Sequence, residues 1–324
     1  METLQQSTSP FSIVQPCEAL SFSEYCKQWL LMIHPKVKAS SYARYHGQII
    51  NHIIPFLGSY CGNTLTEAEM TAFSLFLKES QRLSSKTQKD VLVLLTSVLK
   101  YAGKYEPEYL RLLPEYPRVA RQEMRVLSRY EQKRLTDYLL QDMDSVKFGI
   151  LLALLTGMRI GEICALKWDN ISIRDGKILV RFTMQCIPTE NNTGGCRTRI
   201  IITTPKTEKS LRTIPMSELV ISLCRKMECK NPEAYVLTGN EHYMEPRALQ
   251  YRLRRYTTDC QLEGVHFHTL RHTFATRCME VGMETKILSD ILGHANISIT
   301  LDRYVHASFE IKRENMKKLS AVGM

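Results

Sequence analysis

A stretch rich in proline and arginine, residues 105–126, separates two parts of this chain whose apolar residues follow different periods. Pro107, Pro114 and Pro117 interrupt regular structure, because proline donates no backbone hydrogen bond. Before this stretch the apolar residues recur at helical spacing; after it, helical segments are mixed with short runs typical of strands. With 324 residues the chain is long enough for two domains, joined by this basic linker.

The first part, residues 17–104, carries four segments with the apolar spacing of amphipathic helices. A capping box formed by Ser21 and Glu24 opens the first segment, which carries Trp29. Four helices with short loops are typical of a small independent bundle. Residues 1–16 are polar and are expected to be flexible. The other three helices are expected near residues 40–56, 66–77 and 85–101.

The second part, residues 127–324, mixes both kinds of segment. A capping box at Ser128 to Glu131 begins a helix, and Gly157 marks the end of the next one. The expected fold class is therefore mainly α with a small antiparallel β-sheet. Helices are expected near residues 128–143, 145–156 and 159–167 and again from 217 to 319, and strands near 171–173, 178–187, 199–204 and 212–215.

Composition restricts the partners and the compartment. Lys and Arg outnumber Asp and Glu by 43 to 33, and this formal charge of +10 favours a polyanionic partner, nucleic acid before membrane. No apolar run approaches the ~20 residues that span a bilayer, and the N-terminus lacks a signal-peptide pattern. The ten cysteines form no Cys-x-x-Cys pair, so reduced thiols in a cytoplasmic protein are the simplest interpretation.

Between His268 and Tyr304 the chain carries bases, a guanidinium and a phenol that suit attack on a phosphodiester. A phenol, with a pKa near ~10, is a poor nucleophile at neutral pH unless neighbours withdraw its proton and neutralise charge on the group it attacks. Residues three apart share one face of a helix, so His268 and Arg271 can point at one target. An ordinary polar helix face is the alternative for these residues taken alone.

Three histidines close together, His266, His268 and His272, raise the question of a zinc site. No cysteine or carboxylate completes a ligand set at ordinary spacing. We therefore expect no metal and no cofactor.

Two further cations lie upstream. Arg159 follows Gly157, which allows a sharp turn, and Glu162 can orient it by a charge-assisted hydrogen bond; a surface salt bridge is the alternative. Lys206 lies between two strand-like runs, at an expected hairpin tip from which an ammonium group can donate a proton. A solvated turn lysine is the alternative there.

These elements form five motifs in order: Thr-Gly-Met-Arg-Ile-Gly-Glu ending at Glu162, Pro-Lys-Thr around Lys206, His-Thr-Leu-Arg-His from His268, Leu-Gly-His ending at His294, and Arg-Tyr ending at Tyr304. Together they resemble the tyrosine recombinase (phage integrase) family. Each motif alone is weak, but the ordered set is specific. The resemblance covers about residues 17–319 and implies a four-helix, SAM-like core-binding domain followed by an α+β catalytic domain.

The resemblance implies a phosphoryl-transfer site. Arg159 and Arg271 would grip the non-bridging oxygens of the scissile phosphate, a task that suits planar guanidinium groups. His294 would donate a hydrogen bond to the same phosphate, and Lys206 would be the general acid for the departing 5′-oxygen. These cations would neutralise the transition state, so neither a divalent metal nor ATP is required.

The resemblance also implies the nucleophile. Tyr304 would form a 3′-phosphotyrosine and release a 5′-hydroxyl, while His268 would help to move the proton of the phenol. His272 and Glu162 would support this set without performing chemistry. A phosphotyrosyl bond keeps the energy of the broken phosphodiester, so a 5′-hydroxyl of another strand can reverse the step.

The implied partner is a double-stranded DNA recombination site. Strand exchange needs four cleavages, which implies a homotetramer on two DNA sites. A helix near residues 308–319 would dock on a neighbouring protomer or on its own domain, and a role for an accessory excision factor is left open. The candidates for DNA contact share a positive charge, with a solvated surface as the alternative: Lys86, Lys89, Arg121, Arg125, Arg252, Arg254 and Arg255.

An extra stretch before Lys206, residues 181–201, resembles integrases of conjugative transposons and related mobile elements. We therefore expect a protein of a bacterium, a phage or a mobile element that integrates and excises such an element. Xer-like resolution of chromosome or plasmid dimers is the first alternative, and the order of motifs disfavours a type IB topoisomerase. An inactive DNA-binding regulator would lack Arg159, Arg271 or Tyr304, and none is missing.

Overall fold

The computed structural model describes residues 20–62, 64–79, 82–120, 124–189, 198–204, 211–294, 296–298 and 300–301. The predictions for residues 1–16, Arg121, Lys206, Tyr304 and the helix near residues 308–319 lie outside these ranges. Within them the chain divides near residue 122 into two compact units. None of the described helices is long and apolar enough to cross a membrane.

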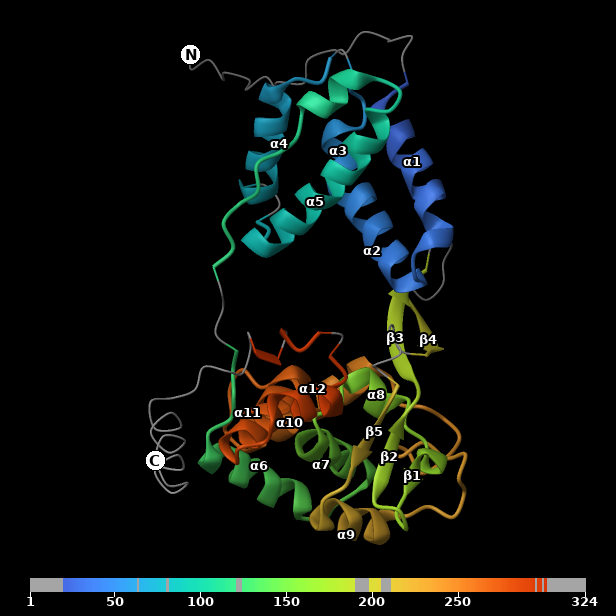
Figure 1. Cartoon of the computed structure of the whole chain (residues 1–324), viewed down its shortest axis with the longest axis vertical. Coiled ribbons are helices and arrows are strands. Elements are labelled where there is room, and N and C mark those ends of the chain that lie inside the picture. Colours follow the sequence, from blue (N-terminus) through green and yellow to red (C-terminus); the bar gives the residue numbers. More distant parts are fainter. Residues whose placement is uncertain are drawn as a thin grey trace, which may run out of the picture. The chain divides into compact units, whose positions relative to one another are not determined.

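The first unit is helical (Figure 1). Its described part confirms the four predicted helices, because α2, a π-helical turn and α3 follow one another without a gap and together make the second one. The elements are α1 (Phe22–Ile33), α2 (Ala39–Gln48), α3 (Ile54–Leu57), α4 (Glu67–Glu79) and α5 (Ser85–Ala102), with the π-helical turn η2 (Ile49–Ile53) and the 3-10 turns η1 (His34–Lys36) and η3 (Pro107–Arg111).

The apolar faces of α1, α4 and α5, together with η2 and α3, build the core of this unit. Val91, Leu95 and Val98 on α5 are fully buried, because their helical spacing places them on one face. The predicted capping box is present at the start of α1, where the backbone N–H of Ser21 donates to Oε2 of Glu24 at 2.9 Å. This contact satisfies a donor that the helix itself cannot use.

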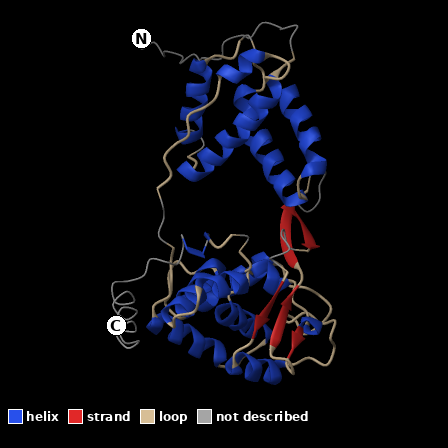
Figure 2. Ribbon diagram, viewed as in Figure 1, coloured by secondary structure: helices blue, strands red, loops and turns tan. Residues whose placement is uncertain are grey.

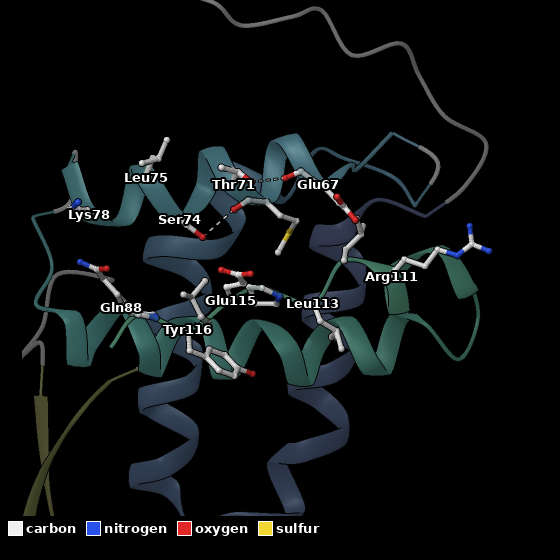
Figure 3. A pocket seen from close by; sticks show the side chains of 15 residues that line it. Glu67, Thr71, Ser74, Leu75, Lys78, Gln88, Arg111, Leu113, Glu115 and Tyr116 are labelled. Atoms are coloured by element: carbon white, nitrogen blue, oxygen red, sulfur yellow. Dashed lines mark hydrogen bonds between the residues drawn. The ribbon is translucent and has the colours of Figure 1, made fainter. Parts of the chain in front are cut away.

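Part of the segment predicted as a linker packs on the first unit. Tyr109 is fully buried, and its ring centroid lies 5.5 Å from that of Phe22 and 5.6 Å from that of Tyr25. Residues 111–117 then line a groove of about 550 Å³ together with residues of α4 and α5 (Figure 3). These residues therefore pack on the helices, although their prolines predicted a connector.

A nearly all-apolar helix, α7 (Ser145–Thr156), lies at the centre of the second unit. Every residue from Phe148 to Leu154 is buried, as expected for a helix that other elements surround. Helices α6, α9 and α11 pack against it. The other helices are α6 (Arg129–Leu140), α8 (Ile160–Cys164), α9 (Glu218–Met227), α10 (Pro246–Asp259), α11 (Phe267–Glu280) and α12 (Thr285–Leu292), with the 3-10 turn η4 (Trp168–Asn170).

The described strands form two small sheets, where the sequence predicted one (Figure 2). In the larger sheet Ile178 pairs with Ile171 on one side and with Ile214 on the other, both antiparallel. The run predicted over residues 178–187 breaks at Arg181 and Phe182, which are both exposed. The larger sheet holds β1 (Ile171–Ser172), β2 (Lys177–Val180) and β5 (Arg212–Pro215), and the smaller one holds β3 (Thr183–Pro188) and β4 (Thr198–Thr203).

The strands on either side of Lys206 belong to different sheets. In the described part of the chain β4 pairs with β3, whereas β5 pairs with β2 over its whole length. Lys206 itself lies outside the described residues, so its place at the tip of a hairpin stays a prediction.

Candidate active site

Arg159 is presented by the turn between α7 and α8. Gly157 follows the last residue of α7, adopts a left-handed φ of 68°, and donates from its N–H to the carbonyl oxygen of Ala153 at 3.0 Å. An added Cβ at Gly157 would lie 2.5 Å from Cδ1 of Phe274. Glycine is therefore required for its conformation and for the close packing, and the turn places Arg159 at the N-cap of α8.

Glu162, on the first turn of α8, holds Arg159 in two ways. Its Oε2 accepts from the backbone N–H of Arg159 at 2.8 Å, and its Oε1 accepts from Nη1 at 2.7 Å. The side chain of Glu162 is 2% exposed, whereas that of Arg159 is 34% exposed. A buried anion thus orients a guanidinium group that stays partly accessible from outside.

Arg212, at the start of β5, forms a second ion pair with the same carboxylate. Its Nη1 donates to Oε1 at 2.9 Å and its Nη2 to Oε2 at 2.8 Å, the parallel geometry that favours arginine for carboxylates. The side chain of Arg212 is 4% exposed. The sequence did not single out this residue, because an arginine close to lysines in the sequence resembles an exposed surface residue. Its partner Glu162 also lies 50 residues away along the chain.

The two guanidinium groups determine the charge of Glu162. Burial by itself raises the pKa of the carboxyl group, but the hydrogen bonds and charge of Arg212, with the charge of Arg159, outweigh burial and lower the pKa to about 2. The carboxylate is therefore ionised at neutral pH, and both arginines are held by a full negative charge.

Arg271 lies on α11, and its side chain reaches the ends of two other helices. The residue is 3% exposed. Its Nη1 donates to the carbonyl oxygen of Gly157 and its Nη2 to that of Leu292, each at 2.7 Å. The position of Arg271 is thereby fixed relative to the turn that presents Arg159.

Three successive carbonyl groups at the C-terminal end of α12 each accept a hydrogen bond from a different arginine. The last carbonyl groups of a helix lack partners within the helix and carry partial negative charge, so cations are stabilising there. The arginines of two separate sequence motifs are thus brought together immediately before His294. The donors and the carbonyl oxygens that accept from them are Nε of Arg212 and O of Ile291 at 2.6 Å, Nη2 of Arg271 and O of Leu292 at 2.7 Å, and Nη2 of Arg159 and O of Gly293 at 3.2 Å.

His294 follows this helix end and is 7% exposed. Its backbone N–H donates to the carbonyl oxygen of Ser289 at 3.1 Å, and its Nδ1 lies 2.7 Å from Oγ1 of Thr300. With the threonine hydroxyl as the donor, Nδ1 accepts and the ring proton sits on Nε2. That tautomer can donate a hydrogen bond to an anion.

Helix α11 also carries His268 and His272. Their rings are nearly perpendicular, with an interplanar angle of 86° and 4.9 Å between centroids. His272 is buried and His268 is exposed, so the buried ring packs beneath the accessible one. Among the described residues, no group of three or more His, Cys, Asp or Glu is arranged to hold a metal ion.

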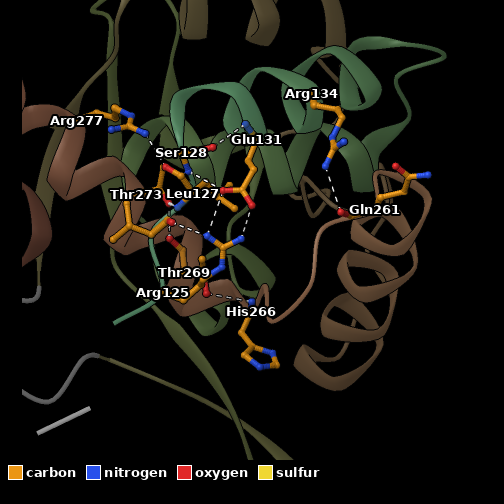
Figure 4. Close-up of polar contacts among 11 residues, drawn as sticks. Arg125, Leu127, Ser128, Glu131, Arg134, Gln261, His266, Thr269, Thr273 and Arg277 are labelled. Atoms are coloured by element: carbon orange, nitrogen blue, oxygen red, sulfur yellow. Dashed lines mark hydrogen bonds and ion pairs between the residues drawn. The ribbon is translucent and has the colours of Figure 1, made fainter. Parts of the chain in front are cut away.

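Arg125, a candidate for DNA contact, is engaged by a protein carboxylate. Its Nη2 and Nη1 form ion-paired hydrogen bonds with Oε1 and Oε2 of Glu131 at 2.5 and 3.1 Å (Figure 4). This pairing lowers the pKa of the Glu131 carboxyl group to about 2. A phosphate would have to compete with Glu131 for this arginine. The other described candidates are all exposed: Lys86 and Lys89 on α5, and Arg252, Arg254 and Arg255 on α10.

Family models match most of the chain. Residues 122–310 match the phage integrase family, and residues 21–77 match the N-terminal SAM-like domain of phage integrases. The first match covers most of the second unit with all five sequence motifs, and the second covers much of the helical bundle.

Known proteins with related sequences include recombinases and transposition proteins. A "tyrosine recombinase XerC-like" of Caldanaerobacter subterraneus is 30% identical over 177 residues, which are 50% of this chain and 45% of that protein. The ICEBs1 integrase of Bacillus subtilis is 24% identical over 273 residues, 79% of this chain and 70% of the integrase. The transposase from transposon Tn916 of Enterococcus faecalis is 29% identical over 189 residues, 53% of this chain and 44% of the transposase. The first and third matches span less than half of those relatives.

Solved structures share the fold. The Tn1549 transposon integrase, in complex with circular intermediate DNA, has a TM-score of 0.74 and 22% identity, covering 93% of this chain and 100% of that one. A lambda integrase dimer bound to a core site has a TM-score of 0.63 and 15% identity, covering 90% and 79%. The resemblance inferred from the five motifs is confirmed: this chain belongs to the phage integrase family of tyrosine recombinases.

Proposed function

We propose that this protein is a site-specific DNA recombinase that cuts and rejoins DNA strands through a 3′-phosphotyrosine intermediate. The proposal is carried by the meeting of Arg159, Arg271 and His294 at the C-terminal end of α12, although they are far apart in the sequence. Two guanidinium groups and an imidazole in one place suit the binding of a single phosphate group.

The charge at this place favours an anion. Arg159, Arg212 and Arg271 bring three positive charges, and Glu162 brings one negative charge. The excess positive charge is partly buried, where it interacts more strongly with a phosphate than it would in bulk water. Arg159 and Arg271 would bind the non-bridging oxygens, and His294 would donate a hydrogen bond to the same group.

The chemistry requires a nucleophile and a general acid, and the sequence motifs assign both. The phenolic oxygen of Tyr304 attacks the phosphorus atom while the bond from phosphorus to the 5′-oxygen breaks. Lys206 gives its proton to the departing oxygen, and His268 takes the proton of the phenol. Because the 3′-phosphotyrosine keeps the energy of the broken bond, the 5′-hydroxyl of another strand can displace the tyrosine in the reverse reaction.

The supporting roles go to Glu162 and His272. Glu162 fixes the guanidinium of Arg159 at two points, and His272 packs beneath His268 on α11. Neither residue needs to contact the phosphate in order to act in this way. Glu162 orients Arg159, and His272 packs against His268, and these two partners would take part in the reaction.

The substrate would be a double-stranded DNA recombination site. Four cleavages per exchange call for four protomers on two sites, with the C-terminal helix in contact with a neighbouring protomer or with its own unit. An accessory excision factor would set the direction of the reaction. We place the reaction in the bacterial cytoplasm, where chromosomal and mobile-element DNA are found.

We further propose that the DNA belongs to a mobile element that is integrated and excised. The separate two-stranded sheet of β3 and β4 supports this, because the extra residues that form it resemble those of conjugative-transposon integrases. The related ICEBs1 integrase and the Tn916 transposase point in the same direction. Xer-like dimer resolution is the second candidate, which the relative described as XerC-like favours. An assay of site preference would separate these functions. Recombination between two different DNA sites is expected of an integrase, whereas recombination between two copies of one site is expected of a dimer resolvase.

Trapping the covalent intermediate tests the central claim. Nicked DNA that carries the expected crossover site releases a short strand after cleavage, so the reverse reaction cannot occur. In the presence of a metal chelator, we expect the wild-type protein to form a denaturation-resistant adduct at a 3′-phosphate. Tyr304→Phe should form none, because it lacks the attacking oxygen.

A matched variant controls for loss of a tyrosine as such. Tyr130, on α6, is 71% exposed, so Tyr130→Phe should form the adduct at the wild-type rate. An adduct that persists in Tyr304→Phe, or one that forms only with Mg²⁺, would contradict the proposed chemistry.

A further inference from the structure

The carboxylate of Glu162 is shared by two arginines of very different exposure. Arg159 approaches it from the same turn with a side chain that is 34% exposed, and Arg212 approaches it from β5 with one that is 4% exposed. Arg212 makes the more regular contact, with parallel hydrogen bonds of 2.9 and 2.8 Å to the two carboxylate oxygens. The accessible guanidinium therefore depends on an anchor that a buried guanidinium also holds.

Arg212 is itself fixed by the fold. Its backbone pairs with Val180 in the three-stranded sheet, and its Nε donates to the carbonyl oxygen of Ile291 at 2.6 Å. The side chain thus connects the sheet with Glu162 and with the last turn of α12. Ile291 precedes His294 by three residues, so this contact also bears on the position of the histidine.

Glu162 requires compensation from both cations. A buried carboxylate loses its hydration, and charges with well-directed hydrogen bonds must replace that hydration. Without Arg212, the carboxylate would either pull Arg159 further into the protein or take up a proton. Either change would move the guanidinium of Arg159 relative to the end of α12.

We propose that Arg212 is a positioning residue for strand cleavage, which sets Arg159 through Glu162 and sets the end of α12 before His294 through Ile291. This inference rests on the proposed recombinase function. Arg212 needs no contact with DNA for this role, because its guanidinium is directed at oxygen atoms of the protein on two elements.

The test separates DNA binding from cleavage. With saturating nicked DNA, Arg212→Met should form the covalent complex about 10²-fold more slowly than wild type, the effect of a small misplacement of reacting groups. DNA affinity should change by less than about threefold, because contacts along the whole duplex supply most of it. Arg212→Lys should recover part of the rate, since an ammonium group still compensates Glu162 but cannot form the parallel pair.

A matched control reports on structural loss alone. Arg277 on α11 also donates to a backbone carbonyl group, that of Leu127 (Figure 4), and to a carboxylate, that of Glu280, and neither partner belongs to the end of α12. Arg277→Met should also lower the melting temperature, but by less than Arg212→Met, because the side chain of Arg277 is 22% exposed and that of Arg212 is 4% exposed. At temperatures where it is folded, it should form the covalent complex at the wild-type rate.

Coupling to Arg159 supplies a second measurement. If Arg212 acts through Arg159, the combined effect of Arg159→Lys and Arg212→Lys on the cleavage rate is smaller than the product of the two separate effects. Multiplicative effects, or wild-type rates in both Arg212 variants, would overturn the inference. So would a loss of rate that only follows the unfolded fraction. If the wild-type protein forms no covalent complex at all, the proposed recombinase function fails, and this inference fails with it.

Discussion

Nη2 of Arg271 donates a hydrogen bond to the carbonyl oxygen of Leu292 at 2.7 Å, and this contact ties α11 to the last turn of α12. The same guanidinium also holds the carbonyl oxygen of Gly157 at the end of α7. One buried cation therefore joins three helices that carry different sequence motifs. The geometry of the proposed phosphate site and the stability of the second unit depend on the same side chain.

Arg271→Lys should separate cleavage from binding. Lysine keeps the charge but lacks the planar fork, so it cannot hold both carbonyl groups and a phosphate in one geometry. We expect the rate of covalent-complex formation on nicked DNA to fall by about 10²- to 10³-fold, the usual effect of removing one donor to a developing negative charge. DNA affinity, measured by fluorescence anisotropy, should fall far less.

Arg277→Lys is the control on the same helix. Arg277 likewise donates to a backbone carbonyl oxygen, that of Leu127 at 2.6 Å, so the substitution removes a similar fork from α11. Its cleavage rate should equal that of wild type. Parallel losses of affinity and rate in Arg271→Lys would mean that Arg271 contributes to DNA binding in general rather than to cleavage.

Gly157→Ala should lower the free energy of unfolding by more than the usual replacement of a left-handed glycine by alanine does. Its φ of 68° is unfavourable for alanine by about 1–2 kcal/mol. The new Cβ would also lie 2.5 Å from the ring of Phe274, and such overpacking adds about 1–3 kcal/mol. Because the same turn presents Arg159, the cleavage rate should fall together with the free energy of unfolding in urea.

Gly264 isolates the backbone effect. Its φ is 67°, and an added Cβ there meets nothing within 4 Å, so Gly264→Ala should lose only the conformational part. The difference between the two variants then measures the collision with Phe274. Equal losses in both would show that the end of α7 absorbs the side chain without moving.

The free energy of unfolding of the second unit should fall in acid, with a contribution from Glu162. The folded-state pKa of about 2 lies below the value of about 4.3 expected in the unfolded chain. A lowered folded pKa stabilises the folded state above the unfolded pKa, and this contribution is lost as the pH falls toward 2. Trp29→Phe leaves Trp168, in the core of the second unit, as the fluorescence probe for denaturation between about pH 6 and 2.5.

Glu162→Gln in the same background identifies the group. Removing one partner of a buried ion pair destabilises by about 3–5 kcal/mol at neutral pH, because the arginines lose their counter-charge. The variant should also lose part of the dependence on pH below about 4.3. A dependence on pH identical to that of the parent protein would assign the acid sensitivity to other carboxylates.

Helix positions were predictable because they depend on neighbours in the sequence. The apolar spacing of α5 and the glycine after α7 act over a few residues, and both elements lie where the pattern placed them. Strands pair with partners that are distant in the sequence, so the sequence did not reveal that β2 ends at Val180 and that β3 belongs to a second sheet.

The motif residues of the site were recognisable, but the contacts that hold them were not. Several of these contacts are made to backbone carbonyl oxygens, such as those of Ile291 and Gly293. Because every residue has a backbone carbonyl group, the identity of the residue does not indicate such a contact. The pairing of Arg212 with Glu162 depends on the sheet register that brings β5 beside α8. An arginine that serves a structural anion therefore looks the same in the sequence as one that awaits a phosphate.

The exposed arginines of α10 and the paired Arg125 should differ in their effect on DNA binding. A residue that neutralises one phosphate contributes about one unit to the slope of log affinity against log salt, so Arg254→Ala should reduce this slope by about 1. Arg125→Ala should change it less, because Arg125 already pairs with Glu131. Anisotropy titrations over a range of NaCl concentrations measure both slopes. If the slope is unchanged in Arg254→Ala, Arg252→Ala and Arg255→Ala alike, α10 does not belong to the DNA interface. If Arg125→Ala changes the slope more than Arg254→Ala does, DNA displaces Glu131 from Arg125.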